Sequence, residues 1–278
     1  MRQRFSDPER FLADGALPEV NSGVASIPLG RPDIRAEELA AIAEALRAAG
    51  GGSAKKFIRL CETELSAMHA PARALVTQSC TAALELAMLM LDLAPGDEVI
   101  MPSFSFASTA NAVALRGAVP VFVDVRPDTL NIDERLVDGA ITERTRAILP
   151  VHYAGVACDM DVLLEVAGRH GLAVVEDAAQ AFGATYRGKP LGSLGTLGAI
   201  SFHETKNVVS GEGGCLLIRD PGLLDRALIG REKGTDKAAF QEGRVAQYSW
   251  ADLGSAYAMH EVLAAFLHAQ LQKAERIT

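Results

Sequence analysis

The chain has little cysteine, and its cysteines follow no metal or redox pattern. The 278 residues contain four scattered cysteines, Cys61, Cys80, Cys158 and Cys215. No two of them form a Cys-x-x-Cys pair, and none has a histidine at zinc-finger spacing. Disulfide frameworks and structural zinc sites need closely and regularly spaced ligands. The pattern therefore argues against both, predicts no bound metal, and favours reduced cysteines in a cytoplasmic protein.

Long apolar segments and basic runs are also missing. The longest apolar stretch, Ala82 to Leu91, contains Glu85 and is too short to cross a bilayer. The first residues lead into no apolar core of the signal-peptide kind. The formal net charge is −8, and no cationic face for phosphate backbones is evident. We therefore expect a soluble protein with neither a membrane nor a nucleic acid partner.

The sequence does contain a regular alternation of short apolar runs and helix-length segments. The apolar runs span residues 74–76, 98–101, 119–123, 147–151, 172–175, 199–202 and 215–218. The helix-length segments span residues 37–49, 54–69, 81–91, 105–116, 133–140 and 159–170. Short apolar runs suit strands covered on both faces, and this alternation is typical of a doubly wound sheet. The sequence predicts an α/β fold with a mostly parallel sheet.

The two ends of the chain differ from this alternating part. Residues 1–27 have the weakest pattern and are predicted to form an irregular arm, whereas residues 28–253 form the predicted large domain. Residues 254–278 are predicted to form one long helix, rich in Ala, Leu and Phe. No later segment in the sequence could cover its apolar face, so we expect a partner surface to bury part of it.

Functional residues are expected just after the apolar runs, because open parallel sheets bind ligands beyond the carboxyl ends of their strands. The segment Gln78–Ala83 (Gln-Ser-Cys-Thr-Ala-Ala) joins a strand to a helix, where free N–H groups suit a phosphate. An ordinary Ser or Thr helix cap is the common alternative. The glycines at 192, 195 and 198 do not match a dinucleotide fingerprint and are interpreted as loop glycines.

Two further segments carry charged residues at strand ends. Asp177, in Val-Val-Glu-Asp-Ala-Ala-Gln, ends a buried strand and must pair with a cation or cap a helix. Lys206, in Ser-Phe-His-Glu-Thr-Lys-Asn, stands in a polar turn before Gly-Glu-Gly-Gly. The ordinary interpretation is a lysine on the protein surface. The alternative is a catalytic lysine whose amine forms a Schiff base with an aldehyde. Pyridoxal phosphate (PLP) would use both residues, since its ring nitrogen needs a buried carboxylate.

Taken together, the three segments resemble the sugar-nucleotide aminotransferases, PLP enzymes with the aspartate-aminotransferase fold (fold type I). Their motifs occur in the family's order, and the aspartate precedes the lysine by 206 − 177 = 29 residues. The resemblance extends from about Ile27 to the end of the chain. Several other stretches, such as Pro95–Ser103 and Arg231–Thr235, resemble the dTDP-4-amino-4,6-dideoxygalactose transaminases.

The resemblance implies a role for each matching residue. Lys206 would hold PLP and move the proton, Asp177 would pair with the pyridinium nitrogen, and Gln180 would lie beside the ring hydroxyl. Phe106 would stack on the ring. The remaining roles fall to Cys80, Thr81 and Ser201 at the cofactor phosphate, and to His152 and Tyr153 on the substrate side.

The resemblance also implies an activity: an amino group moves from glutamate to a dTDP-linked 4-keto-6-deoxyhexose within a homodimer. Two departures stand out. Ala256 precedes Tyr257 where the family usually supplies a cross-subunit Asn, and the family's small domain of ~100 residues is expected to be absent beyond Thr278. A PLP-dependent sugar-nucleotide dehydratase is an alternative. Those enzymes have a histidine in place of the Schiff-base lysine, so the presence of Lys206 argues against it. A catalytically silent binding domain is another.

Overall fold

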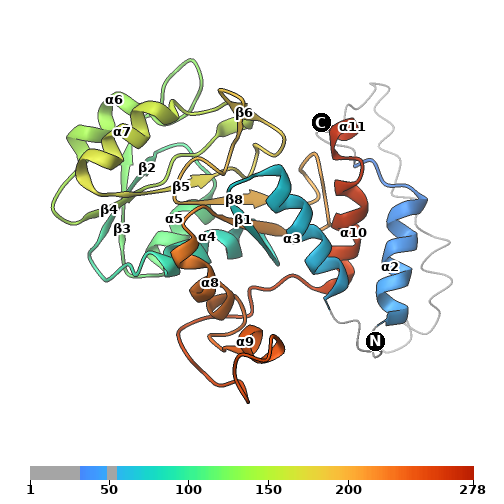
Figure 1. The fold of residues 1–278 in the computed structure, drawn as a ribbon. Coiled ribbons are helices and arrows are strands. Elements are labelled where there is room, and N and C mark those ends of the chain that lie inside the picture. The colour runs from blue at the N-terminus through green and yellow to red at the C-terminus, as the bar shows by residue number, and fades with distance from the viewer. Residues whose placement is uncertain (1–31, 49–54) are drawn as a thin grey trace, which may run out of the picture. The chain divides into compact units, whose positions relative to one another are not determined.

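A seven-stranded sheet forms the centre of the fold (Figure 1). The computed structural model describes residues 32–48 and 55–278, so the predicted arm at 1–27 lies outside the described residues. The strands are β1 (Arg73–Thr77), β2 (Glu98–Pro102), β3 (Val119–Val123), β4 (Thr145–Ile148), β5 (Ala173–Asp177), β8 (Leu197–Ser201) and β9 (Gly214–Ile218). Their order is β1-β9-β8-β5-β4-β2-β3. Strand β9 is antiparallel to both neighbours and the other pairs are parallel, which confirms the predicted mostly parallel sheet.

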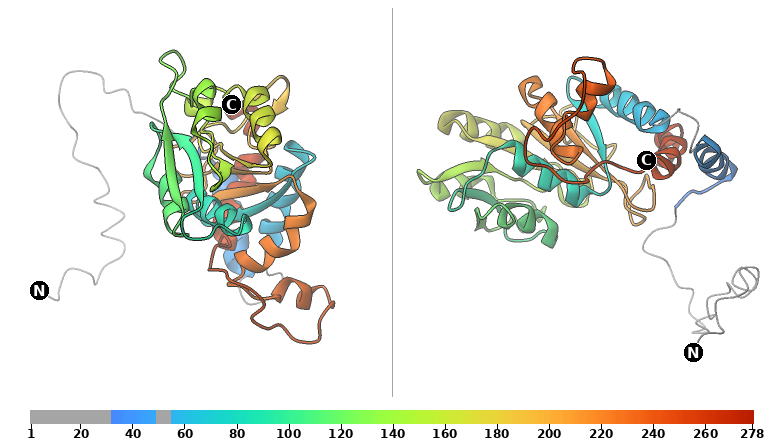
Figure 2. Two further views of the ribbon diagram at one scale, coloured as in Figure 1. Left: turned by 90° about the vertical axis from the view of Figure 1, so that its left-hand side faces the viewer. Right: turned by 90° about the horizontal axis from the view of Figure 1, so that it is seen from below.

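Helices cover both faces of this sheet. One face packs against α4 (Cys80–Met90), α5 (Ala107–Ala114) and α8 (Leu224–Arg231). The other packs against α3 (Lys56–Met68), α7 (Met160–His170) and α10 (Glu261–Leu271), with α2 (Ala36–Ala48) lying against α10 (Figures 1 and 2). The short elements are α6 (Glu134–Val137), the β6–β7 hairpin (Thr185–Tyr186 and Lys189–Pro190), α9 (Lys237–Gln241), α11 (Ala274–Ile277) and the 3-10 helices at Asp138–Ala140, Tyr153–Gly155 and Pro221–Leu223. In the described ranges no helix is long and apolar enough to cross a membrane.

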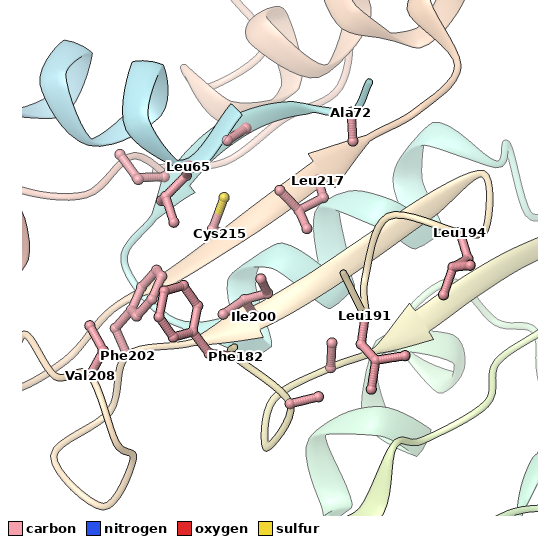
Figure 3. Packing of buried hydrophobic residues seen from close by; sticks show 14 of the residues in the cluster. Leu65, Ala72, Phe182, Leu191, Leu194, Ile200, Phe202, Val208, Cys215 and Leu217 are labelled. Carbon is pink, nitrogen blue, oxygen red and sulfur yellow. The ribbon is translucent and has the colours of Figure 1, made fainter. Parts of the chain in front are cut away.

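Alternation along the strands divides the core into two apolar clusters. On β9, Cys215 and Leu217 join the cluster under α3 and α10 (Figure 3). Leu216 between them joins the cluster under α4. On β5, Val174 and Val175 divide in the same way. Successive side chains of a strand point to opposite faces, and β5 continues with two carboxylates. This alternation therefore sends Glu176 and Asp177 to opposite faces of the sheet.

The predicted single helix at 254–278 is wrong. Residues before α10 are extended, because Tyr257 accepts a backbone hydrogen bond from Gln78 and donates one to Arg231. At Gly254 a Cβ atom would lie 2.2 Å from the backbone nitrogen of Gly234, so the chain passes too close for a helix with side chains. Helix α10 begins only at Glu261 and α11 follows a break at residues 272–273.

The prediction that this helix has an uncovered apolar face is wrong as well. The buried side chains of α10, including Ala264, Leu267 and Leu271, belong to the apolar cluster that contains α3. Helix α2 lies beside α10, joined by a hydrogen bond from Gln270 to the buried Glu38 at 2.8 Å. Helices of this one chain therefore cover the face that had indicated a partner surface.

Candidate active site

A cavity of about 430 Å³ lies at the carboxyl edge of the parallel strands. Its walls come from the N-termini of α4 and α5 and from the segments that follow β4, β5 and β8. All but one of the predicted site residues line it: Cys80, Thr81, Phe106, Tyr153, Asp177, Gln180, Ser201 and Lys206. Segments far apart in the sequence thus meet where the sheet topology predicts a ligand site.

The N-terminus of α4 forms one wall of the cavity. Ser79 is the helix N-cap, and its hydroxyl oxygen accepts from the N–H of Ala82 at 3.1 Å. Cys80 and Thr81 follow as the first residues of the helix, where N–H groups have no partner within the helix. The Thr81 hydroxyl lies 2.8 Å from the hydroxyl of Ser108 on α5. Ordinary capping and a phosphate-binding wall are therefore compatible, since different residues serve the two roles.

Glycine at 214 allows β9 to approach this helix end. A Cβ atom there would lie 2.4 Å from the backbone nitrogen of Cys80 and 2.4 Å from the carbonyl carbon of Ser79. No side chain larger than hydrogen fits at that distance without movement of the helix terminus. Sequence reasoning named the Gly-Glu-Gly-Gly run only as part of the turn that carries the lysine, and the contact depends on a pairing that spans more than 130 residues.

Asp177 is buried, with 4% of its surface exposed. Its Oδ2 accepts from the hydroxyl of Thr109 at 2.8 Å, and its Oδ1 accepts from the N–H of Ala179 at 3.1 Å. Burial raises the pKa of this carboxyl, and the Thr109 hydroxyl, the Ala179 N–H and the charge of Lys206 lower it in part. A carboxylate with two donors among the described residues retains acceptor capacity for a cation in the cavity.

Thr109 was missed by sequence reasoning. It is fully buried on α5, and Ser105, four residues earlier, donates to its oxygen at 2.7 Å. The two hydroxyls form a chain that ends on Asp177. A signal was present in the hydroxyl residues Ser105, Ser108 and Thr109, which gather around the start of α5. It could not be read without knowing which helix face meets β5.

Lys206 is carried by a loop that extends the β8–β9 pair beyond the sheet. Backbone hydrogen bonds join Phe202 to Gly213 and Glu204 to Gly211, and the Lys206 N–H donates to the carbonyl of His203 at 2.9 Å. The lysine is half-buried and faces the same cavity as the aspartate. It is therefore not the free surface lysine that was the ordinary alternative.

The other wall carries aromatic and amide groups. Phe106 is the N-cap of α5, lines the cavity and is 76% exposed. The side-chain oxygen of Gln180 accepts from the N–H of Ala154 at 2.7 Å, which leaves its amide hydrogens available as donors. The ring of Tyr153 packs against the ring of Phe104, with 5.0 Å between the two ring centroids.

His152 does not lie in the cavity, so its predicted place on the substrate side is wrong. Its side chain has no exposed surface, and Nε2 lies 2.9 Å from Oε2 of Glu176, which is also fully buried. The neighbours Val151 and Tyr153 line the cavity instead. Val151 pairs with Asp177 as in a strand, and successive side chains of a strand alternate in direction, so His152 points away from the cavity that Val151 lines.

A family model assigns residues 32–278 to the DegT/DnrJ/EryC1/StrS aminotransferase family. This chain belongs to that family. A spore coat polysaccharide biosynthesis protein of Bacillus subtilis is 42% identical over 214 residues. The UDP-4-amino-4-deoxy-L-arabinose–oxoglutarate aminotransferase of Shewanella sediminis is 38% identical over 256 residues.

Solved structures agree with the family. A sugar aminotransferase of Streptococcus pneumoniae in its PMP form superposes with a TM-score of 0.83 and 30% identity, covering 90% of this chain and 68% of that one. The same protein is also solved in a PLP form. The two sequence relatives cover 77% and 91% of this chain, but the chain spans only 55% and 65% of their lengths.

Proposed function

We propose that this chain binds PLP and acts as a sugar-nucleotide aminotransferase. The observation that carries the proposal is the meeting of Lys206 and Asp177, from the ends of the adjacent strands β8 and β5, in one cavity. The residues fit the cofactor: a buried carboxylate for a cationic ring nitrogen, an amine for an aldehyde, and a helix N-terminus for a phosphate. Solved relatives in PLP and PMP forms support the same assignment.

When bound, PLP accepts the donor's amino group and draws electrons from the reacting carbon into its ring. The side chains of this chain supply the rest. Asp177 would hold a proton on the ring nitrogen, because a cation beside it favours its ionised form and offsets the burial that raises its pKa. The Nζ atom of Lys206 would remove the proton from the reacting carbon and return it two atoms away, on the cofactor side of the amino nitrogen. The Gln180 amide would donate to the ring hydroxyl.

The substrates that we propose are glutamate and a dTDP-linked 4-keto-6-deoxyhexose. Their support is the resemblance of Pro95–Ser103 and Arg231–Thr235 to dTDP-4-amino-4,6-dideoxygalactose transaminases. The relatives named for polysaccharide and amino-sugar synthesis act in the same area of chemistry. We further propose that the protein works in the cytoplasm, where its four free cysteines would stay reduced.

We also propose a homodimer that forms without PLP. Support comes from a group of exposed aromatic side chains around α9, with Phe240, Tyr248 and Trp250 exposed by 42%, 53% and 78%. Apolar groups gathered in this way are typical of interaction surfaces. Sedimentation of the apo and PLP-treated protein at micromolar concentration would test it. A monomer in both forms contradicts the dimer, and a dimer only with PLP contradicts its independence from the cofactor.

Mass spectrometry of the product tests the activity. The protein is incubated with PLP, glutamate and a panel of 4-keto and 3-keto sugar nucleotides, with the Lys206→Ala variant as the control. Replacement of a ketone by an amine on the dTDP-linked 4-keto sugar, absent in the variant, is the expected result. A protein that carries PLP and converts glutamate but aminates no member of the panel would contradict the proposed substrate class.

A further inference from the structure

A second buried carboxylate lies beside the cavity-facing aspartate on β5. Glu176 has no exposed surface, and its carboxylate accepts four hydrogen bonds. Its Oε1 accepts from the backbone N–H groups of Leu194 and Gly195, both at 2.7 Å. Its Oε2 accepts from the N–H of Gly192 and from Nε2 of His152, both at 2.9 Å. Four donors satisfy an ionised carboxylate, so this side chain needs no ligand.

The glycines spaced by three create the room for this arrangement. Gly192 has a φ of +87°, which favours glycine, and a Cβ atom at Gly198 would lie 2.1 Å from its carbonyl oxygen. A Cβ atom at Gly195 would lie 2.6 Å from a backbone oxygen of β5. The side chains of Leu191 and Leu194 enter the apolar cluster (Figure 3), which anchors the loop. The backbone N–H groups of this loop are thereby held around the carboxylate.

His152 connects this arrangement to the cavity. Its Nδ1 accepts from the N–H of Cys158 at 3.2 Å, so the ring proton is on Nε2 and is donated to Glu176. The His152 backbone N–H donates to the carbonyl of Asp177 at 3.0 Å, and the Asp177 N–H donates to the carbonyl of Pro150 at 2.9 Å. His152 is therefore tied to two consecutive residues of β5, once by its ring and once by its backbone.

We propose that Glu176, His152 and the backbone of residues 192–195, together the Glu176 clamp, position Asp177 in the cavity. Strand β4 ends at Ile148, and beyond it the segment 150–152 continues the pairing on that edge of β5, while β8 pairs with Glu176 and Asp177 on the other edge. The clamp holds that segment and the 192–195 loop to the end of β5. Its loss would let the strand end shift and would move the Asp177 carboxylate. The inference rests on the proposed function, in which Asp177 holds a proton on the cofactor ring.

A double-mutant cycle on PLP affinity tests this role. Glu176→Gln places an amide where two of the four donors point, and His152→Phe keeps a ring but removes the donor. Each variant is expected to weaken PLP binding about tenfold, the effect of losing one hydrogen bond to a charged group. In the Asp177→Asn background the same changes are expected to alter the dissociation constant by less than about twofold, because coupled sites are not additive. Equal losses in both backgrounds would mean a general structural role and would overturn the proposal.

Two further variants separate positioning from folding. His152→Gln returns an N–H donor to the ring's place and is expected to recover PLP affinity to within about threefold of wild type, as restoration of one bond requires. Glu98→Gln is the matched control, since Glu98 is a buried carboxylate of the same sheet at the amino end of β2. It is expected to lower stability without any coupling to Asp177→Asn. Failure of His152→Gln to improve on His152→Phe would contradict the clamp.

Measurements on the apoprotein distinguish this proposal from the proposed function. Amide hydrogen exchange in residues 190–197 is expected to rise in Glu176→Gln and not in Glu98→Gln. Asp177→Asn is expected to raise the free energy of unfolding of the apoprotein, because it removes a buried charge. In the His152→Phe background this gain is expected to be roughly half as large, because a displaced Asp177 carboxylate is less buried. Unchanged loop exchange, or an unchanged gain, would overturn the clamp whether or not PLP binds. A wild-type chain that takes up no PLP, with both apoprotein results as expected, would instead refute the proposed function.

Discussion

Two buried carboxylates, adjacent on β5, differ in how many hydrogen-bond donors the fold provides for them. Glu176 points to the α3 and α10 face and receives four donors from its own chain. Asp177 points to the α4 and α5 face and receives two, one of them from a threonine hydroxyl. A buried charge is costly unless it is paired. The comparison shows a stabilised carboxylate that fixes structure beside an incompletely satisfied one that is left for a ligand.

The surroundings of the two carboxylates also differ, since one lies against the apolar core and the other faces the cavity. On the Glu176 side, Leu191 and Leu194 seal the loop into the apolar core (Figure 3). On the Asp177 side, hydroxyl groups of Ser105, Ser108 and Thr109 face a cavity. Functional sites commonly keep groups that do not favour folding. We therefore expect substitutions on the cavity side to impair the chemistry, and the opposite side to serve only as support.

The largest effect is expected from Asp177→Asn. Without the charge that keeps the ring nitrogen protonated, the half-reaction with glutamate should slow at least about a hundredfold. Single-turnover absorbance changes would measure it. Rates within about threefold of wild type, under ~1 kcal/mol in transition-state energy, would contradict the role.

The same variant should make the apoprotein more stable at neutral pH. Burial raises the pKa of Asp177, so the fold binds its proton more tightly than the unfolded chain does. That contribution favours the fold below the unfolded carboxyl pKa and is lost as the pH rises through the raised value. Urea unfolding across acid to neutral pH should therefore show that the stability advantage of the variant over wild type grows as the pH rises. A variant less stable than wild type at neutral pH would show that Asp177 is already satisfied.

A smaller but clear effect is expected from Gly214→Ala. The new methyl group would meet the backbone of Ser79 and Cys80, and overpacking of this kind costs about 1–3 kcal/mol. PLP affinity should fall as well, because the N-terminus of α4 must move. Gly168→Ala on α7 is the control, since a Cβ atom at that position would meet nothing within 4 Å and alanine favours a helix. Equal stability of the two variants would disprove the tight contact.

The smallest effect is expected from Ser79→Ala, which removes the cap of α4. Loss of the hydrogen bond to the Ala82 N–H should lower the free energy of unfolding by about 1 kcal/mol. Ser79→Thr keeps a hydroxyl at this position and should recover most of that loss. If the alanine variant is as stable as wild type while PLP binding collapses, the hydroxyl serves the ligand rather than the helix.

Much of this arrangement could be predicted from the sequence, because strands and their ends follow from apolar runs and turn residues. Asp177 and Lys206 were found in this way, each just past a buried run. The direction of His152 could not be found, since β4 ends at Ile148 and the residues after it pair with β5 only through the bridge between Val151 and Asp177. The contact at Gly214 and the extended segment before α10 depend on pairings between distant parts of the chain, which local pattern does not encode.

Reductive trapping of PLP would identify the lysine that binds the cofactor. The protein is incubated with PLP, reduced with borohydride, digested, and mapped by mass spectrometry, with Lys206→Ala treated in parallel. We expect one covalent PLP adduct, on Lys206, together with a visible absorbance band that the variant lacks. An adduct on any other lysine, or equal labelling of the variant, would contradict this assignment.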